Sequence, residues 1–218
     1  LGLRYRGRYE ESLTYSRGCY PSSLSRGDLQ AQSWALLGQL QNTIPLGRME
    51  EVPALIEKLL PMLDESLEVE VIQDVRGQLA DAYLRLGQRD KALELVSIAA
   101  PVMAATRPAN FYLVAGYTAI SQTIFTLWDE AIAMDAPNQA DLQKLAEQAV
   151  KGWKAYARVF PIGQPASNMV QGQLARRIGN LAKAKTFLQT ALEHANNFEM
   201  PLEANIIKGE IANLEANS

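Results

Sequence analysis

Apolar residues recur three or four positions apart through most of this chain, which is the spacing of one face of an α-helix. The segments 28–42, 70–86 and 110–128 follow this pattern, and 141–160 is a longer amphipathic stretch. No segment alternates apolar and polar residues between turn signals, and no Asn-Gly pair marks a β-hairpin. The pattern therefore predicts an all-α fold.

Three segments repeat at intervals of 40 residues. They read "GRYEESLTYSRGCYP" from Gly7, "GRMEEVPALIEKLLP" from Gly47 and "GQRDKALELVSIAAP" from Gly87. The residues that align with one another after the glycine are Glu10, Glu50 and Asp90, then Ser12, Val52 and Ala92, then Pro21, Pro61 and Pro101. A period of this length indicates a stacked array of structural repeats.

Each recurring position has a mechanical role in a pair of helices. Glycine adopts a positive φ angle, so it lets one helix end and the chain turn tightly. The acidic residue then lies in the first turn of the next helix, where the helix dipole favours negative charge. The small residue lets two helices approach closely, and the proline should end or kink the second helix because it lacks an N–H. The predicted unit is helix, tight turn, helix.

Two weaker copies extend the array. "TLWDEAIAM" has Thr126 in place of the glycine, followed by Asp129 and Ala131, and "GNLAKAKTFLQTAL" begins at Gly179. The spacings are then 40, 40, 39 and 53 residues, and we assign the longest to the helix expected over 141–160. We expect antiparallel hairpins that turn at the repeat glycines.

The segment "LADAYLRLGQRDKALELV" resembles a tetratricopeptide repeat, and "WALLGQL" resembles the opening of another copy. The family's large, small, aromatic, glycine and alanine positions fall on Leu79, Ala80, Tyr83, Gly87 and Ala92. The family's usual unit has about 34 residues, so the units here are longer. The resemblance implies a tetratricopeptide-like α-solenoid of antiparallel helical hairpins, a single domain over 1–218 with a period of about 40 residues.

A second segment, 156–204, is similar to the C-terminal helical region of large bacterial signalling proteins. In those proteins a nucleotide cyclase or protein kinase head is joined to a predicted ATPase and then to tetratricopeptide-like helices. "FPIGQP", "GNLAKAK" and "MPLEA" carry the match. The resemblance implies a regulatory segment of a longer signal-transduction protein, and the start at Leu1 fits such a fragment.

Composition is that of an ordinary globular domain, with 48% hydrophobic and 21% charged residues. A net charge of −3 gives no electrostatic footprint for nucleic acid. The single cysteine, Cys19, forms no intrachain disulfide, favours a reducing and hence cytoplasmic location, and is expected to be buried. No apolar run is long enough to predict membrane insertion.

Charged residues are unevenly distributed along the chain. The first stretch is basic and a later stretch is acidic; their residues are Arg4, Arg6, Arg8, Arg17 and Arg26, and Asp64, Glu65, Glu68, Glu70 and Asp74. Solvated helix faces are the ordinary interpretation of both stretches, and a charged binding groove is the alternative.

Candidate catalytic chemistry is sparse. "GNLAKAKT" approaches a P-loop, but Ala184 stands where a P-loop needs glycine and the preceding segment is helical rather than a strand. One histidine, His194, and one cysteine cannot form a Cys/His metal site, and no "GxSxG" motif is present. The adjacent Asp129 and Glu130 point in different directions on a helix. We expect no enzymatic activity, no cofactor and no metal.

The predicted function is a non-catalytic protein-interaction module. A solenoid presents a concave groove that holds a peptide or a neighbouring domain. By the family's pattern, the groove residues in the best-matched copy are Asp74, Asp81, Leu84 and Arg85. A homodimer through an exposed end of the solenoid is a further expectation.

The alternative is a sensor of a small effector molecule in a helical pocket. Tyr112, Trp128 or Trp153 in the wall of a pocket would favour this alternative. For Trp34, Trp128 and Trp153, core packing is the expected role and a ligand-stacking platform is the alternative.

Overall fold

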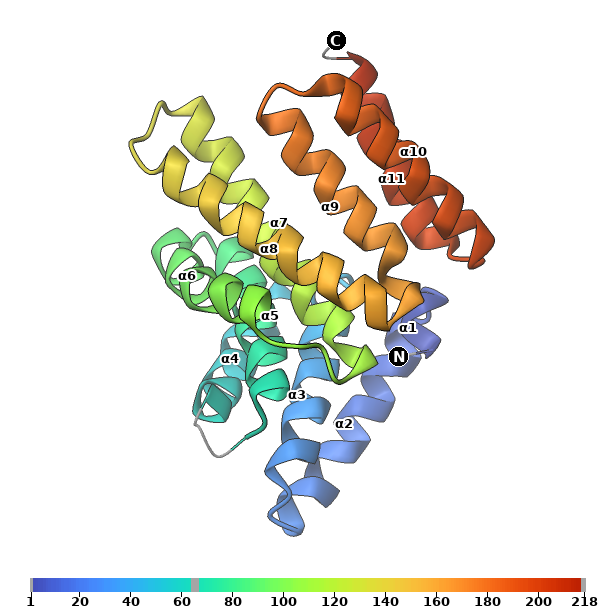
Figure 1. Ribbon diagram of the computed structural model, residues 1–218. Coiled ribbons are helices and arrows are strands. Elements are labelled where there is room, and N and C mark those ends of the chain that lie inside the picture. The colour runs from blue at the N-terminus through green and yellow to red at the C-terminus, as the bar shows by residue number, and fades with distance from the viewer. Residues whose placement is uncertain (1, 64–66, 217–218) are drawn as a thin grey trace.

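The computed structural model describes residues 2–63 and 67–216, and these residues form α-helices and short 3-10 helices without any strand (Figure 1). The all-α prediction is thereby confirmed. The α-helices are α1 (Gly2–Tyr5), α2 (Tyr9–Ser25), α3 (Leu29–Thr43), α4 (Val52–Leu59), α5 (Val69–Arg85), α6 (Arg89–Ala105), α7 (Val114–Ala133), α8 (Gln139–Val159), α9 (Gln164–Arg177), α10 (Leu181–Asn197) and α11 (Pro201–Ala216). The 3-10 helices are η1 (Met49–Glu51), η2 (Leu60–Leu63), η3 (Phe111–Leu113) and η4 (Pro161–Gly163).

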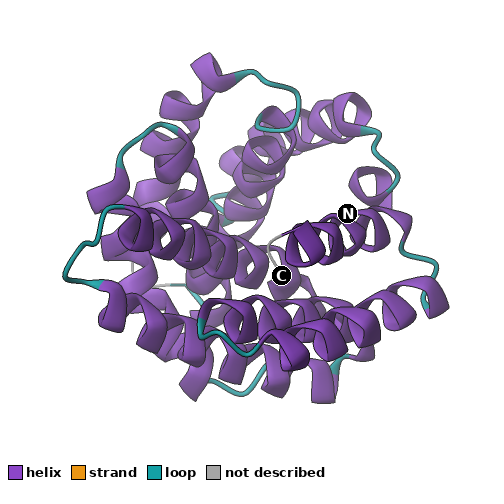
Figure 2. Ribbon diagram, turned by 90° about the horizontal axis from the view of Figure 1, so that it is seen from above, coloured by secondary structure: helices purple, strands orange, loops and turns teal. Residues whose placement is uncertain are grey.

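Helices pack mainly against their neighbours in the chain and against the next helix but one. The pairs α2 and α3, α5 and α6, and α9 and α10 lie side by side, as do α5 with α7 and α6 with α8. One layer therefore contains α5 and α7, and a second layer contains α6 and α8. Seen from above, the helices are arranged around the middle of the molecule (Figure 2).

The four repeat glycines form the tight turns that the sequence predicts. The φ angles of Gly7, Gly47, Gly87 and Gly179 are 72, 73, 75 and 80°, and residues with a β-carbon rarely adopt such values. At Gly87 the N–H donates to the carbonyl of Leu84 at 3.0 Å, and the next N–H donates to the carbonyl of Tyr83 at 2.9 Å. This pair of bonds is the Schellman motif, and it ends α5 in an orientation that starts α6.

The position predicted for the fourth copy is wrong. Thr126, Asp129 and Ala131 all lie inside α7. The chain turns at Asp135, nine residues after Thr126, and the φ angle of Asp135 is 49°. The N–H of Asp135 donates to the carbonyl of Ile132 at 3.2 Å in the same kind of turn. Aspartate tolerates this backbone conformation better than most residues, so the turn forms here without a glycine.

The prolines do not end the helices in two of the three copies. α2 continues four residues beyond Pro21, and α6 continues four residues beyond Pro101. Only Pro61 follows a helix end, since α4 stops at Leu59 and η2 begins. In α6 the burial of Val96, Ala99, Ala100 and Met103 around the proline offsets the backbone hydrogen bond that it removes, whereas α2 buries only Leu13 and Ser23.

Buried aromatic residues form the centre of the largest core cluster. Tyr117, Trp153 and Tyr156 are almost fully buried, with ring centroids 5.5 to 5.8 Å apart in edge-to-face pairs. The indole N–H of Trp153 donates to Ser121 Oγ at 3.0 Å, which satisfies the one polar atom of that side chain. Trp128 is also buried, so the expected core role is confirmed for two tryptophans. Trp34 is 48% exposed, and for this residue the expectation is wrong.

Small residues set how closely α5 and α7 approach. A β-carbon added to Gly77 would lie 2.4 Å from the carbonyl oxygen of Gly116, and one added to Gly116 would lie 2.6 Å from Cα of Asp74. The two backbones are therefore in direct contact at this crossing. That contact brings Asp74 of α5 against the first turns of α7.

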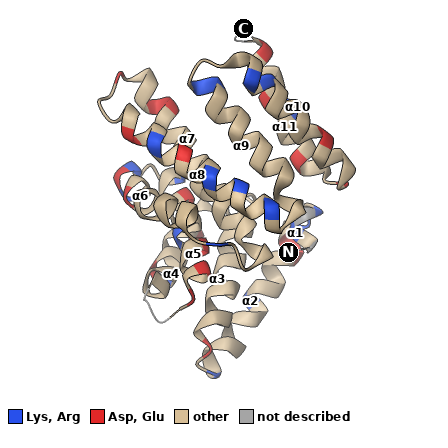
Figure 3. Cartoon of the chain, in the orientation of Figure 1, with Lys and Arg blue, Asp and Glu red and all other residues tan. Residues whose placement is uncertain are grey.

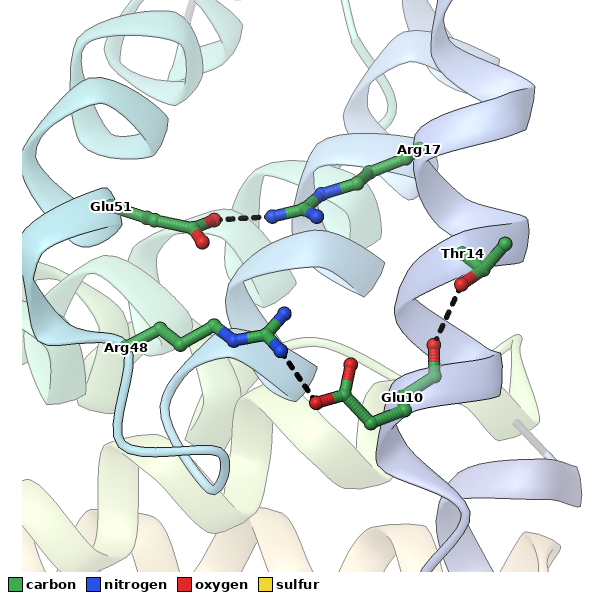
Figure 4. A network of polar contacts seen from close by, with 5 residues as sticks. All are labelled: Glu10, Thr14, Arg17, Arg48 and Glu51. Atoms are coloured by element: carbon green, nitrogen blue, oxygen red, sulfur yellow. Dashed lines mark hydrogen bonds and ion pairs between the residues drawn. The ribbon is translucent and has the colours of Figure 1, made fainter.

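Ion pairs link successive copies at the surface. Arg48 pairs with Glu10 at 2.5 Å and Arg17 pairs with Glu51 at 2.5 Å, so α2 is joined to the segment that begins α4 (Figure 4). Thr14 Oγ1 donates to the carbonyl of Glu10 at 2.9 Å. Exposed pairs of this kind contribute about 0–1 kcal/mol each, so they align the copies more than they stabilise them.

Candidate functional site

Two cavities share part of their lining. The first, which we call the inner cavity, has a volume of about 300 Å³ and is lined from α1, α2, α3, α5, α7, α9 and α11 together with η3 and η4. The second, which we call the aromatic cavity, has a volume of about 530 Å³ and lies between α2, α3, α5 and the start of α7. Both are lined by Arg4, Gln41, Phe111 and Ala115.

The inner cavity has an apolar wall. Phe111 of η3, Ile162 of η4, and Leu202 and Ile206 of α11 line it, and each is between 40% and 59% exposed. Two further helices that reach the cavity carry few charges: α3 has none, and α9 has only the arginines of its last turn (Figure 3). Apolar side chains that stay exposed in a concave surface are typical of a binding site.

The four residues expected to form a groove are placed differently from one another. Asp81 and Arg85 line the inner cavity and pair with each other on α5, with Arg85 Nε 2.8 Å from Asp81 Oδ2. Asp74 lines the aromatic cavity instead. Leu84 lines neither cavity, because it packs against the two core clusters on either side of α5. Three of the four residues therefore line one or the other cavity, and their role in binding a partner stays a prediction.

Asp74 is buried, which contradicts its interpretation as part of a solvated acidic face. Its side chain is held at the crossing of α5 and α7, and its Oδ1 has no hydrogen-bond partner. Burial raises the pKa of Asp74 from 3.8 to about 7, and contacts with Gln78, Arg4 and the backbone of Gly116 lower it in part. Asp64 and Glu65 lie outside the described residues.

Asn42 places a second unsatisfied oxygen at the aromatic cavity. Its Nδ2 donates to Ser12 Oγ at 3.0 Å and to the carbonyl of Gly38 at 2.5 Å. Its Oδ1 is buried and has no partner. Nothing in the sequence singles out Asn42, because an asparagine in a helical segment gives no sign of whether it faces solvent or the interior.

Three aromatic side chains line the same cavity. The rings of Trp34 and Tyr112 meet edge to face with centroids 6.0 Å apart, and those of Phe111 and Tyr112 with centroids 6.2 Å apart. The expectation for a sensor pocket included Tyr112, which lines the cavity, and Trp128 and Trp153, which lie in the core. Trp34 is the tryptophan that the structure places at a cavity.

The surroundings of Tyr112 are acidic. Burial raises the pKa of this tyrosine, and the negative charges of Glu68, Glu70 and Asp74 raise it further. Arg4 opposes this field with one positive charge, and its Nη1 donates to Gln41 Oε1 at 3.0 Å. Among the residues that line the aromatic cavity, the charged ones are Arg4 and Asp74.

The remaining sequence candidates have structural roles. In "GNLAKAKT" the side chain of Asn180 caps α10 by accepting the N–H of Lys183 at 3.1 Å, and the preceding element is the helix α9. This segment is therefore a helix start after a helix and not a P-loop. His194 lies in the last turn of α10 and stacks on Phe198, with centroids 6.3 Å apart.

The adjacent carboxylates of α7 separate as expected. Asp129 pairs with Arg177 of α9 at 2.5 Å, and Glu130 pairs with Arg89 of α6 at 2.6 Å. These two side chains thus join α7 to two different helices and form no acid–base pair. Cys19 is exposed on α2, so the expectation that it is buried is wrong.

Within 2–63 and 67–216, no group of three or more His, Cys, Asp or Glu side chains is arranged to hold a metal ion. In the same residues, none of the helices combines the length and the apolar character needed to cross a membrane.

Comparisons with known proteins show a likeness in fold. No protein-family model matches the chain, and no curated protein matches it. Among solved structures, the chain is similar to the crystal structure of BtubC (BKLC) from P. vanneervenii. The TM-score is 0.53 and the sequence identity 14%, over 98% of this chain and 86% of that chain. At this identity the similarity concerns the helical fold alone.

Proposed function

We propose that this chain is a tetratricopeptide-like α-solenoid that acts as a non-catalytic interaction module of a larger bacterial signalling protein. It binds a peptide or a neighbouring domain in its inner cavity. The turns at Gly7, Gly47 and Gly87, each 40 residues after the last, support the repeat architecture. The resemblance of 156–204 to the helical region of signalling proteins supports the place in a larger regulator.

The single observation that carries the proposal is the composition of the inner cavity. Exposed apolar side chains from η3, η4 and α11 face the same volume as the ion pair between Asp81 and Arg85. Burying apolar area contributes roughly 25 cal/mol per Å², so an aliphatic or aromatic side chain of a partner would supply the main part of the affinity. The charged pair at α5 would orient a polar group of the partner.

The test uses a partner selected for binding and a matched pair of variants. A peptide-display library is selected on the immobilised chain, and the enriched peptides are titrated in solution. Ile206→Asp introduces a charge into the inner cavity, and Ile98→Asp does the same on α6, outside both cavities; the two residues are 43% and 45% exposed. We expect Ile206→Asp to weaken binding at least about tenfold, which corresponds to about 1.4 kcal/mol.

Equal effects of the two aspartates would show that the peptides bind elsewhere, and the proposal would fail. Substitution of Asp81 and Arg85 to alanine provides a further arm of the experiment. We expect it to reduce affinity by a smaller factor, because an exposed pair contributes little energy. Unchanged binding after both substitutions would remove the ion pair from the proposed site.

A second candidate function is a sensor of a small effector, and one observation favours it. The aromatic cavity has a volume of about 530 Å³, which is in the range of small-molecule sites, and Tyr112 lines it. A metabolite that raises the unfolding temperature of the chain, but not that of Trp34→Ala, would support this alternative. The absence of any such metabolite in a broad screen would count against it.

A further inference from the structure

We propose that the aromatic cavity binds a small organic carboxylate that carries an aromatic group. The inference names the ligand class for the sensor function, on which it rests, and it does not depend on a peptide in the inner cavity. Two features of the aromatic cavity carry it. One end has the positive charge of Arg4 beside the amide of Gln41, and the other end has the rings of Trp34 and Tyr112.

The helix α3 sets the distance between these two ends. Trp34, Leu37, Gly38 and Gln41 all line the cavity, and their spacing is that of one helix face. Because each residue of an α-helix rises 1.5 Å, Trp34 and Gln41 are separated by about 10 Å along the axis. Gly38 lies between them and has no side chain to fill the space. An aryl group joined to a carboxylate by a short alkyl chain spans a similar length.

Arg4 provides an unpaired cation at one end of the cavity. Its Nη1 donates to Gln41 Oε1 at 3.0 Å, and it forms no ion pair with a carboxylate in the described part of the chain. The other arginine at the cavities, Arg85, is already paired with Asp81. A guanidinium has five N–H donors in a planar fork that matches the two oxygens of a carboxylate. Arg4 therefore keeps donors free for an anionic ligand.

The neighbours of Arg4 are also donors. Gln41 accepts from Arg4 through its oxygen, so its Nε2 is left to donate. Ser12 Oγ accepts from Asn42 Nδ2 at 3.0 Å, so the hydroxyl proton of Ser12 is left to donate as well. Within 2–63 and 67–216, neither of these donors has an acceptor. An ionised carboxylate has acceptors only, so it fits this end of the cavity.

The acidic and amide oxygens nearby do not face a ligand. Oδ1 of Asn42 and Oδ1 of Asp74 are buried without accessible surface. The Asp74 carboxyl is hydrogen-bonded by Gln78 and the backbone of Gly116, and burial raises its pKa to about 7, so it carries only part of a negative charge at neutral pH. Among the described residues that line the cavity, Arg4 alone is fully charged there. An anion is therefore favoured over a cation.

The opposite end suits an aromatic group. The rings of Trp34 and Tyr112 meet edge to face with centroids 6.0 Å apart, and Trp34 remains 48% exposed. A third ring can add to such a pair in an offset or edge-to-face arrangement. The negative charges of Glu68 and Glu70 act on Tyr112, so they disfavour an anionic group at this end. The ligand is thereby oriented with its carboxylate at Arg4 and its ring at Trp34.

The experiment uses 4-phenylbutyrate as the probe and 4-phenylbutanamide, which has the same shape without the charge, as the control. Both are titrated into the full chain at pH 7, and binding is measured from the aromatic NMR signals of the probe. We expect the carboxylate to bind at least about tenfold more tightly than the amide, because it pairs with Arg4. Acetate, which lacks the ring, should bind at least about tenfold more weakly than 4-phenylbutyrate.

Variants test the two ends of the cavity separately. Arg4→Gln should reduce the preference for the carboxylate over the amide to less than about threefold. Arg6→Gln removes an exposed arginine that lines neither cavity, and it should leave the preference unchanged. Trp34→Ala alters an exposed side chain, so it keeps the fold, and it should weaken both ligands at least about fivefold without changing the preference.

Equal affinities for the carboxylate and the amide, or a preference that persists in Arg4→Gln, would overturn the inference. Acetate that binds as tightly as 4-phenylbutyrate would mean an adventitious ion only and would overturn it as well. The peptide acetyl-Gly-Phe-Glu-Gly-amide tests the other source of the same chemistry. Weaker binding of this peptide than of 4-phenylbutyrate supports a small-molecule ligand, and equal or tighter binding overturns it.

Ile206→Asp separates this inference from the proposed peptide-binding function, because Ile206 lines the inner cavity alone. We expect this variant to keep its affinity for 4-phenylbutyrate. If display-selected peptides lose affinity in Ile206→Asp while the natural chain does not prefer the carboxylate, the proposed function stands and the inference falls. If the natural chain prefers the carboxylate while the peptides are insensitive to Ile206→Asp, the proposed function falls and the inference stands.

Discussion

The carboxyl group of Asp74 sits where α5 and α7 are in backbone contact, with one oxygen unpaired and Arg4 as the opposing charge. Its place in the acidic stretch 64–74 suggests a solvated side chain, yet only the close approach of Gly77 to Gly116 decides that it is buried. The same holds for Trp34, which has the helical spacing of a core residue but lies at a cavity. Side-chain roles at the site therefore depend on which helices touch, and that information is not local in the sequence.

Asp74→Asn should change the pH dependence of stability. The pKa of Asp74 is raised to about 7 in the folded chain, so folded molecules keep a proton that unfolded ones release as pH rises above about 4. The charged form then costs stability progressively up to about pH 7, and the full cost remains at higher pH. The asparagine variant lacks this cost. We expect its advantage over the natural chain to grow by at least about 1 kcal/mol between pH 5 and pH 8.

Urea unfolding at pH 5, 6, 7 and 8 measures this difference directly. The groups that lower the pKa of Asp74 in part are Gln78, Arg4 and the backbone of Gly116. Glu68 and Glu70, which act on the neighbouring Tyr112, are present in both proteins and cancel in the difference. A difference that does not vary with pH would mean that the buried carboxyl is not the cause.

The turns are the elements that the sequence determines most clearly. Gly7, Gly47, Gly87 and Gly179 each have a positive φ angle, as the repeat predicts, because few other residues adopt that conformation cheaply. The positions that depart from the repeat pattern also have physical reasons. Asp135 turns the chain without glycine, and Pro101 stays within α6 because the packing of that helix outweighs one lost hydrogen bond; Pro21 also stays within its helix, α2.

Two alanine substitutions separate the turn from ordinary helix propensity. Gly87→Ala forces a β-carbon into a backbone with φ of 75° and should destabilise the chain by about 1–2 kcal/mol. Gly18→Ala lies within α2 with open space around it and should stabilise by about 0.5–1 kcal/mol. Thermal unfolding of both variants measures these two changes in stability. If Gly87→Ala stabilises as Gly18→Ala does, the turn does not need glycine.

At the scale of the whole molecule, the helices and their order follow from apolar spacing and turn chemistry, but the cavities do not. The inner cavity is lined by Arg4 and Tyr9 near one end of the chain and by Leu202 and Ile206 near the other. Such a meeting depends on the curvature that accumulates over all helix pairs, which no short motif encodes. The similar fold of BtubC (BKLC) supports the helical architecture.

The central claim is that a peptide lies in the inner cavity. A crystal structure of the chain with a display-selected peptide tests it most directly. We predict that the peptide contacts α5, α7 and α11, with Ile206 buried against it. A peptide bound across the outer layer of α6 and α8, with the inner cavity empty, would contradict the account.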